Sequence, residues 1–455
     1  MSLSIKKNNT PLVHCIGIGG IGISALARWF LAQNWRVSGS DIATSELIKE
    51  LIKDGCNVKI GHKKATISSR TALVIYNQAI PNNNPELRRA RKLKIPVLSY
   101  PQAIGSLTRS YRTIAVAGAH GKSTTTALAS LILIAGGFDP TVIIGTKLKE
   151  FAPPAGGKNF RLGKSHYLVL EADEWRASFL NYSPTFTIIT NIDKEHLDFY
   201  KNIKNIRAAF LSFLRKTKIG GFLILNRDNI YLRGLKTTIS KIARDKELKI
   251  VWYSTQQPEA KIIRRIMRIP GNHNVSNALA AYTLGRLLKI PKQKILASLA
   301  SYRGAWRRME YRGKFQGALV FDDYAHHPTE IKATLGALKE RYPNKNILCI
   351  FQPHQAKRLA ALFAEFLTAF DDADETLILP SYEVAGRDLH MTKHDSRELV
   401  KTIQKKNPKK LIFYLEKPKN LVKAVRSLRS PLSRKVIVMM GAGNIFEHTE
   451  LLINN

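Results

Sequence analysis

The sequence predicts an α/β protein with three domains. Its 455 residues are enough for two to four domains at roughly 100–200 residues each. Short apolar segments alternate with helical segments along most of the chain, which is typical of βαβ units around a parallel sheet. Two glycine-rich stretches each follow an apolar segment and precede a helical one, so at least two domains have a loop suited to an anion.

The first domain is predicted to cover residues 1–109 and to be Rossmann-like. It has one clear helical segment, Ser24–Gln33. Its predicted strands are Val13–Ile16, Arg36–Gly39, Ala72–Tyr76 and Val97–Leu98. The polar stretch Ser106–Arg112 then leads to a new apolar segment, and the second domain begins near residue 110.

The second and third domains, 110–308 and 309–455, repeat the same rhythm. A long helical segment, Val275–Leu288, follows the turn Pro270-Gly271-Asn272 near the end of the second domain. The second domain's predicted strands are Thr113–Ala117, Tyr167–Leu170, Thr187–Thr190 and Phe222–Leu225. Those of the third domain are Leu319–Phe321, Ile347–Phe351, Thr376–Leu379, Leu411–Tyr414 and Val436–Met439.

Composition excludes several classes of protein. No apolar run reaches the roughly 18–20 residues that span a bilayer, and the N-terminal residues lack the apolar core of a signal peptide. The three cysteines, Cys15, Cys56 and Cys349, show no CxxC spacing. This argues against a disulfide framework and a cysteine-based zinc site, and predicts a reducing, cytoplasmic location.

The chain is strongly basic, with 72 Lys and Arg against 34 Asp and Glu and a formal net charge of +38. Such an excess is compatible with nucleic acid or an anionic membrane surface. The basic residues, however, are spread over the chain, and no RNP, zinc-finger or homeodomain pattern is present. We therefore expect small polyanionic substrates and no specific nucleic acid.

The first glycine-rich stretch is Gly17-Ile18-Gly19-Gly20-Ile21-Gly22, which fits G-x-G-x-x-G. An acid, Asp41, follows the second strand. Glycines let the backbone approach a pyrophosphate, whose charge the helix N-terminus stabilises. The pattern favours dinucleotide or diphosphate binding over a merely tight turn, and taken alone it suggests NAD.

The second glycine-rich stretch is Gly118-Ala119-His120-Gly121-Lys122-Ser123-Thr124. Its amides and the Lys122 ammonium suit the phosphates of ATP, and the Ser123 hydroxyl suits Mg²⁺. Val116 stands where the usual P-loop has its first glycine, so this loop is shorter. A P-loop ATP-binding central domain beside a second phosphate loop argues against a simple dehydrogenase.

Polar residues follow other predicted strands. Glu171 ends the segment Tyr167–Leu170, where a carboxylate beside a phosphate loop suits Mg²⁺. His196 follows another strand end and is either a second metal ligand or a packed residue. Asn274 and Asn277 share one face of a helix and either bind a ligand or cap the helix. The pair Arg307-Arg308 either neutralises phosphate or forms a solvated surface.

Together these motifs resemble the Mur ligases of peptidoglycan synthesis over nearly the whole chain. The motifs that carry the resemblance are GIGGIGISALA, GAHGKSTTT, EADEWRASFL, TNIDKEHLD, GNHNVSNALAA, WRRME, DDYAHHPTEI and FQPHQAKR. The resemblance implies three domains for a UDP-sugar, ATP and an amino acid. It also implies ATP-dependent joining of L-alanine to UDP-N-acetylmuramate through an acyl phosphate, by a monomer or homodimer.

The resemblance also implies residue roles. Gly17, Gly19, Gly20, Gly22 and Asp41 would bind the UDP-sugar. Gly118–Thr124, Asn274, Asn277 and Asp323 would bind ATP, and Arg308 would reach its γ-phosphate. Ser123, Glu171 and His196 would bind Mg²⁺. The catalytic residues would be Lys122, Glu171, His196 and Arg308. The L-alanine pocket would contain Tyr324, His326, His354 and Arg358.

This chain departs from the family pattern at a few positions. Ala119 and Ser123 replace threonines, Trp175-Arg176 replaces Ser-Asp, and Gln355 stands where an arginine is expected. Alternatives to alanine ligation are the addition of a preformed tripeptide to the same sugar nucleotide and an NAD(P)-dependent oxidoreductase. A nucleic-acid-stimulated ATPase is a third, suggested by the charge.

Overall fold

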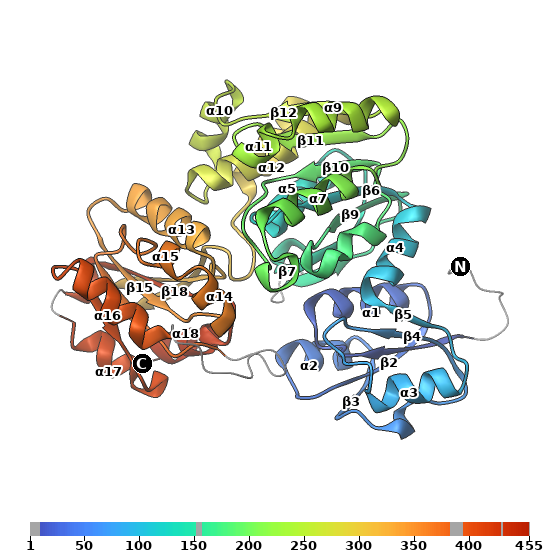
Figure 1. Ribbon diagram of the computed structural model, residues 1–455, viewed down its shortest axis with the longest axis horizontal. Coiled ribbons are helices and arrows are strands. Elements are labelled where there is room, and N and C mark those ends of the chain that lie inside the picture. Colours follow the sequence, from blue (N-terminus) through green and yellow to red (C-terminus); the bar gives the residue numbers. More distant parts are fainter. Residues whose placement is uncertain (1–9, 152–156, 383–394, 429–430, 455) are drawn as a thin grey trace. The chain divides into compact units, whose positions relative to one another are not determined.

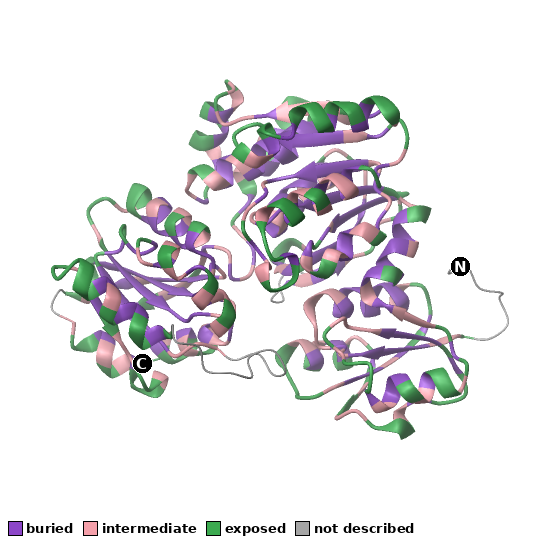
Figure 2. Ribbon diagram, in the orientation of Figure 1, coloured by how far each residue is buried: buried purple, intermediate pink, exposed green. Residues whose placement is uncertain are grey.

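The computed structural model describes residues 10–151, 157–382, 395–428 and 431–454. It contains three mainly parallel sheets, which confirms the predicted α/β fold. Figure 2 shows that the central strands of each sheet are mostly buried, while the helices expose one side. The described residues of 1–193, 203–254 and 280–298 form one compact unit, and those of 194–202, 255–279 and 299–455 form a second. The boundaries after residues 109 and 308 stay predictions.

The first sheet has the strand order β3-β2-β1-β4-β5, and all of its strands are parallel. The chain leaves β1 toward β2 on one side and later returns to β4 on the other, so the end of β1 is the topological switch point at which sheets of this kind bind ligands. The glycine loop 17–20 lies at this point, and Figure 1 shows α1 and α3 on opposite sides of the sheet. The elements are β1 (Leu12–Ile16), α1 (Ile21–Ala32), β2 (Arg36–Asp41), α2 (Glu46–Lys53), β3 (Asn57–Ile60), η1 (Lys64–Thr66), β4 (Thr71–Tyr76), α3 (Pro85–Lys92), β5 (Val97–Ser99) and α4 (Tyr100–Ser110).

The polar stretch before the second domain is mostly helical, because Ser106–Ser110 form the end of α4. A capping box between Ser99 and Gln102 starts this helix, and its apolar residues Ile104 and Leu107 are buried. Polarity in the sequence therefore marks the exposed face of a helix here, not a loop.

The second sheet has the order β12-β11-β10-β6-β9-β7-β8, with β8 antiparallel to β7. The strand β6 lies between β10 and β9, so the second glycine-rich loop follows a central strand. The elements are β6 (Arg112–Ala117), α5 (Lys122–Ala135), β7 (Thr141–Leu148), η2 (Lys149–Phe151), β8 (Lys158–Arg161), β9 (Tyr167–Glu171), η3 (Trp175–Asn181), β10 (Phe186–Ile189), α7 (Ile203–Leu214), β11 (Phe222–Asn226), α8 (Ile230–Arg233), α9 (Lys236–Asp245) and β12 (Lys249–Tyr253).

A network of ion pairs joins the first two sheets within the first unit. Arg28 of α1 is almost fully buried and pairs with Asp54 at 2.7 Å and Glu50 at 3.1 Å. From the β7–β8 hairpin, Lys147 pairs with Glu50 at 2.6 Å and Lys158 pairs with Asp54 at 2.7 Å. Burial acts to raise the pKa of Asp54, but Lys158 and Arg28 outweigh it and lower that pKa. The paired charges thus fix the first sheet to the second.

The third sheet has the order β13-β14-β18-β15-β16-β17, with β13 antiparallel to β14. Helix α13 packs in the core on one face and α17 in the core on the other, as Figure 1 also shows. The elements are β13 (Glu310–Phe315), β14 (Ala318–Asp323), α13 (Pro328–Arg341), β15 (Asn346–Phe351), α14 (Ala356–Ala361), α15 (Phe363–Phe366), β16 (Glu375–Ile378), α16 (Ser396–Lys406), β17 (Leu411–Tyr414), η4 (Pro418–Asn420), α17 (Leu421–Arg426), η5 (Leu432–Arg434), β18 (Lys435–Met440) and α18 (Ile445–Ile453). The remaining helices are α6 (Leu197–Tyr200), α10 (Glu259–Ile266), α11 (Asn272–Leu287) and α12 (Lys292–Ser301).

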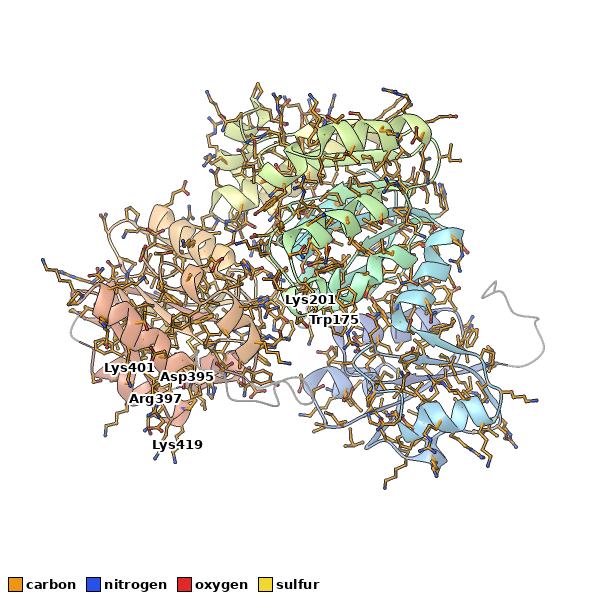
Figure 3. The ribbon with its side chains drawn as sticks, in the orientation of Figure 1. Trp175, Lys201, Asp395, Arg397, Lys401 and Lys419 are labelled. Carbon is orange, nitrogen blue, oxygen red and sulfur yellow. The ribbon has the colours of Figure 1, made fainter. Side chains whose placement is uncertain are left out.

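Basic side chains lie on exposed faces of the helices that accompany the third sheet. Figure 3 shows Arg397, Lys401 and Lys419 at its surface, and Arg397 pairs with Glu416 at 2.8 Å. Within the described parts of the chain, every helix is too short or too polar to span a bilayer.

Candidate functional site

The first glycine loop is held by its own neighbours. Gly17 has a φ of 76°, and the amides of Gly17 and Ile18 donate to the Ser40 carbonyl at 2.8 and 3.1 Å. The Gly19 amide donates to Asp41 Oδ2 at 2.8 Å, and a Cβ at Gly19 would lie 2.9 Å from the same oxygen. Asp41 therefore shapes the loop, a role that the sequence pattern alone did not assign to it.

Two further residues line this loop. A Cβ at Gly20 would lie 2.6 Å from Asn77 Nδ2, and one at Gly22 would lie 2.8 Å from the Tyr100 ring. Asn77 follows β4, which pairs with β1, and its amide donates to the Ile16 carbonyl at 3.0 Å. In the sequence, the one feature that could have indicated Asn77 is its position directly after an apolar strand.

A buried polar network supports the same end of the sheet. Glu86 of α3 has no exposed surface, accepts a hydrogen bond from Ser40 Oγ at 2.5 Å and one from the Thr66 hydroxyl, and lies 3.0 Å from His62 Nδ1. Burial acts to raise the pKa of Glu86, but hydrogen bonds from His14, Ser40 and Thr66 outweigh it and lower the pKa to about 2. The Ser40 carbonyl accepts hydrogen bonds from the loop amides, and the Ser40 side chain belongs to this network. The network around Glu86 therefore stabilises the backbone that holds the glycine loop.

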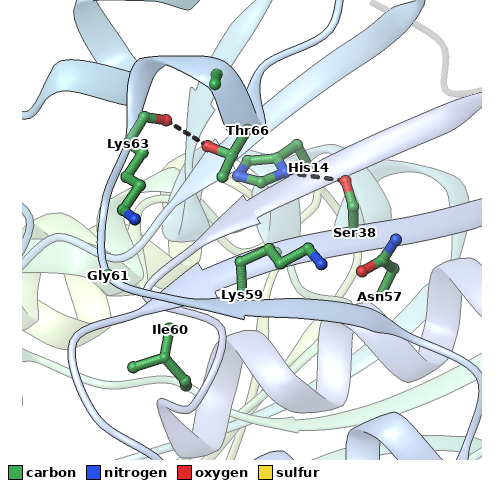
Figure 4. A pocket seen from close by; sticks show the side chains of 10 residues that line it. His14, Ser38, Asn57, Lys59, Ile60, Gly61, Lys63 and Thr66 are labelled. Carbon is green, nitrogen blue, oxygen red and sulfur yellow. Dashed lines mark hydrogen bonds between the residues drawn. The ribbon is translucent and has the colours of Figure 1, made fainter.

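A pocket of about 380 Å³ opens on the face of the first sheet that carries His14 and Ser38 (Figure 4). Lys59 and Lys63 also line it, and His14 Nδ1 lies 2.9 Å from Ser38 Oγ. Among the described residues, its lining includes none of the predicted UDP-sugar residues. The pocket is therefore separate from the glycine loop at the strand end.

The phosphate loop follows β6 and rests on the end of β10. The Thr190 hydroxyl donates to the His120 carbonyl at 2.6 Å, and the His120 amide donates to Asn191 Oδ1 at 2.9 Å. Gly118 has a φ of 140°, and a Cβ there would lie 2.0 Å from Thr190 Oγ1. Gly121, in the left-handed region at 80°, starts α5. The fold thus requires these two glycines, and Thr190 and Asn191 are supports that the motif did not reveal.

Lys122 is held at the loop by backbone and by an acid. Its ammonium donates to the carbonyls of Gly118 at 2.7 Å and Ala119 at 3.2 Å, and lies 2.9 Å from Glu174 Oε2. Burial acts to lower the pKa of Lys122, but Glu174, Asp173 and Glu171 outweigh it and raise that pKa above its ordinary value. The ammonium therefore stays charged, as phosphate binding requires, and Glu174 is a site residue that the sequence did not single out.

Glu171 and Ser123 offer oxygen atoms beside this loop. Glu171 ends β9 opposite Val116 of β6, the strand that leads into the loop, and its Oε1 accepts a bond from the Gly145 amide at 2.9 Å. Ser123 lies in the first turn of α5 and is buried. Carboxylate and hydroxyl oxygens are the ligands that Mg²⁺ prefers, so these residues fit a magnesium ion.

Three predicted residues lie in the first part of the second unit. His196 precedes α6 with a φ of 53°. Asn274 and Asn277 are both buried on α11, and Asn274 Nδ2 donates to the Pro270 carbonyl at 2.7 Å. The Asn274 side chain therefore stabilises the turn before its helix, while its contact with a nucleotide stays a prediction.

The paired arginines have different surroundings. Arg307 is 4% exposed, has a φ of 55° and donates to the carbonyls of Gly443, at 2.9 Å, and Gly441. Arg308 is half-buried, with its guanidinium carbon 4.8 Å from the centroid of the Tyr324 ring. Arg307 thus anchors the loop after β18, and Arg308 remains the candidate for phosphate.

Asp323 makes internal contacts at the end of β14. Its carboxylate accepts bonds from the amides of Met309 and Ala325, both at 2.8 Å, and from Thr334 Oγ1 at 3.3 Å. Burial raises the pKa of Asp323. These bonds position the segments that carry Arg308 and Tyr324, and a direct nucleotide contact stays a prediction.

The structure brings the predicted amino-acid residues together. The Tyr324 and His326 rings lie 5.5 Å apart and the His326 and His354 rings 6.0 Å apart, centroid to centroid. Arg358 Nη1 donates to the His354 carbonyl at 3.2 Å. Burial lowers the pKa of His326 to about 4, although Glu330 and Glu195 act to raise it. His326 is therefore neutral at pH 7.

One acid completes this cluster. Arg358 Nη2 donates to Glu195 Oε1 at 3.0 Å, and Glu195 is 5% exposed. The sequence shows Glu195 next to His196 but not its distant partner, so its place among the amino-acid residues was not predicted. The predicted residues thus fall into two groups: the two glycine loops, Asp41 and Glu171 in the first unit, and the rest in the second.

Three domain families match the chain in order. Residues 12–112 match the Mur ligase family catalytic domain, residues 116–285 the Mur ligase middle domain, and residues 307–443 the Mur ligase glutamate ligase domain. The chain belongs to the Mur ligase family.

Relatives that match this chain over nearly its full length share one name. The UDP-N-acetylmuramate–L-alanine ligase of Clostridium kluyveri is 37% identical, with 100% of both chains covered. The ligase of the same name from Aquifex aeolicus is 34% identical, with 96% of both covered. The crystal structure of the UDP-N-acetylmuramate-alanine ligase of Thermotoga maritima is similar with a TM-score of 0.78 and 26% identity, over 97% of this chain and 98% of that one.

Proposed function

We propose that this chain joins L-alanine to UDP-N-acetylmuramate and converts ATP to ADP and phosphate. The observation that carries the proposal is the full-length likeness to ligases of that name, at 37% identity over both whole chains. The phosphate loop with Lys122 and the cluster of Tyr324, His326, His354 and Arg358 supply what such a reaction needs.

ATP is assigned to the loop Gly118–Thr124. Its amides and the charged Lys122 suit a polyphosphate, and Asn274, Asn277, Arg308 and Asp323 are further ATP-binding residues that the family resemblance implies. Ser123, Glu171 and His196 are assigned to Mg²⁺. When bound, Mg²⁺ offsets charge on the phosphates of ATP.

UDP-N-acetylmuramate is assigned to the first glycine loop, with Gly17, Gly19, Gly20, Gly22 and Asp41. The short contacts that added Cβ atoms would make at Gly19, Gly20 and Gly22 mean that side chains there are excluded, which leaves backbone to face a diphosphate. A nicotinamide cofactor has no place in a ligase, so the chain should bind the sugar nucleotide and not NADH.

The reaction needs no side-chain nucleophile. The carboxylate of the sugar's lactyl group attacks the γ-phosphorus of ATP, which breaks its bond to the bridging oxygen and gives an acyl phosphate and ADP. The neutral amine of alanine then attacks the acyl carbon, the bond from that carbon to the phosphate oxygen breaks, and inorganic phosphate leaves with one of the amine protons. Lys122 and Arg308 offset charge on the transferring phosphoryl group, and Arg358 binds the alanine carboxylate. The three cysteines are all buried and take no part.

A panel of amino acids tests this proposal. The protein is incubated with UDP-N-acetylmuramate, ATP, Mg²⁺ and one amino acid at a time, and phosphate release and product mass are measured. We expect the greatest release with L-alanine and a product heavier than the substrate by one alanyl residue. Release only with a preformed tripeptide, or tight NADH binding without sugar-nucleotide binding, would overturn it.

Three predictions accompany this function: a cytoplasmic location, a monomeric or homodimeric state, and domain boundaries at residues 109 and 308. Size-exclusion chromatography with light scattering tests the oligomeric state.

A further inference from the structure

Glu195 lies between two of the proposed amino-acid residues in the second unit. Its Oε1 accepts a hydrogen bond from Arg358 Nη2 at 3.0 Å and lies 3.8 Å from His326 Nε2. The side chains of Glu195 and Arg358 are 6% and 10% exposed. A charged pair so enclosed is stable only while its remaining hydrogen-bonding groups are satisfied.

The second oxygen of this carboxylate is not satisfied. Glu195 Oε2 is buried, and it has no hydrogen-bond partner among the described residues. Buried polar atoms are normally paired, and leaving one unpaired costs about 1–3 kcal/mol, more when it is charged. Because protein encloses the oxygen, only a molecule that enters this cluster or a rearranged side chain supplies a donor.

His326 adds a second acceptor at the same place. Its Nδ1 lies 2.9 Å from the Tyr324 carbonyl and 3.3 Å from Glu330 Oε2, two acceptors, so Nδ1 carries the proton. Nε2 is then a lone-pair acceptor facing Glu195 Oε1. Two acceptors cannot bond to each other, and a group with several N–H donors would satisfy both.

An amino acid carries such a group next to a carboxylate. We propose that Glu195 and His326 bind the α-amino group of the amino-acid substrate, beside Arg358, which binds its carboxylate. The inference rests on the proposed function and deepens it, because acid, imidazole and guanidinium together match the ammonium and the carboxylate of a zwitterion. It makes Glu195 a specificity-determining residue for α-amino acids against simple carboxylates or amines.

The test compares L-alanine with propionate, which has the carboxylate and lacks the amino group. KM for L-alanine and Ki for propionate, as a competitive inhibitor, are measured for wild type and Glu195→Gln. We expect the KM to rise about 10- to 100-fold, the effect of losing a charge-assisted hydrogen bond. Ki for propionate should stay within about threefold, because Arg358 is kept.

A positioning role alone gives a different result. If Glu195 only orients Arg358, the KM for L-alanine and the Ki for propionate rise together in Glu195→Gln, and the inference is wrong. It is also wrong if neither changes. The matched control is Glu365→Gln, which removes an acid whose side chain is 42% exposed and pairs with Lys194 at 3.4 Å, and both constants should stay at wild-type values.

A second variant covers the case in which Glu195→Gln does not fold. Glu195→Asp keeps the charge and withdraws the oxygens by one methylene, so KM for L-alanine should again rise while Ki for propionate holds. Wild-type protein that releases no phosphate with any amino acid would contradict the proposed function. Normal wild-type turnover with parallel constants in the variants would contradict this inference alone.

Discussion

Replacing Glu86 by glutamine should lower the stability of the first sheet in a pH-dependent way. Glu86 is fully buried, and its network lowers its pKa from 4.5 to about 2. At about 1.36 kcal/mol per pKa unit, this shift corresponds to about 3 kcal/mol of stability at neutral pH. Glu86→Gln removes the charge and keeps the shape, so it should lose about that amount at pH 7.

The sign of the pH dependence follows from the direction of the shift. Because the pKa of Glu86 is lowered in the folded protein, its stabilisation is complete above the ordinary value of 4.5 and is lost as the pH falls toward 2. At pH 3 about 1.4 kcal/mol should remain, so the difference between wild type and variant should shrink by about 2 kcal/mol between pH 7 and pH 3.

Hydrogen exchange read by mass spectrometry measures this locally. Peptides that cover β1 and β2 report the free energy of opening once intrinsic exchange rates are corrected for pH. The control is Glu46→Gln on α2, an acid whose side chain is 68% exposed and which should change nothing. A difference between wild type and Glu86→Gln that is equal at pH 7 and pH 3 would refute the reasoning.

Three further substitutions test the phosphate and amino-acid sites. Glu171→Gln removes a carboxylate beside the phosphate loop and should cut phosphate release about 100-fold or more without changing the melting temperature; near-normal turnover would count against a magnesium role. Gly118→Ala places a Cβ 2.0 Å from Thr190 Oγ1 and should abolish ATP binding in calorimetry, while Gly137→Ala, with positive φ but no atom within 4 Å, should bind normally. Gln355→Arg adds a cation at the start of α14 near Arg358 and should lower the KM for L-alanine with little change in kcat. An unchanged or higher KM would place the substrate carboxylate elsewhere.

Most of the buried parallel strands were predictable, because their sequences are continuous apolar runs. The predicted strand Ile347–Phe351 matches β15 to within one residue. All residues of β15 except the first, Asn346, are buried. Two of the edge strands lack that signal. β3 has the sequence NVKI and exposes three of its four residues, and β8 has the sequence KNFR. Neither was predicted, because their polar residues pair with a neighbouring strand only once the sheet exists.

The site was predictable where its chemistry is local in sequence. Both glycine loops were found, since a strand, a glycine pattern and a helix follow one another along the chain. Asn77, Glu174 and Glu195 were missed because each acts through a partner far away in the sequence, respectively Gly20, Lys122 and Arg358. A contact of that kind depends on the tertiary fold and cannot be predicted from the spacing of residues along the sequence.

The central claim is that the carboxylate of UDP-N-acetylmuramate is activated by phosphoryl transfer before alanine attacks it. The most direct measurement uses UDP-N-acetylmuramate labelled with ¹⁸O in that carboxylate, with ATP, Mg²⁺ and L-alanine, and determines the mass of the released phosphate. The account predicts that each phosphate carries one ¹⁸O atom, because the carboxylate oxygen that attacks phosphorus leaves with it. Unlabelled phosphate released alongside the alanyl product would contradict it.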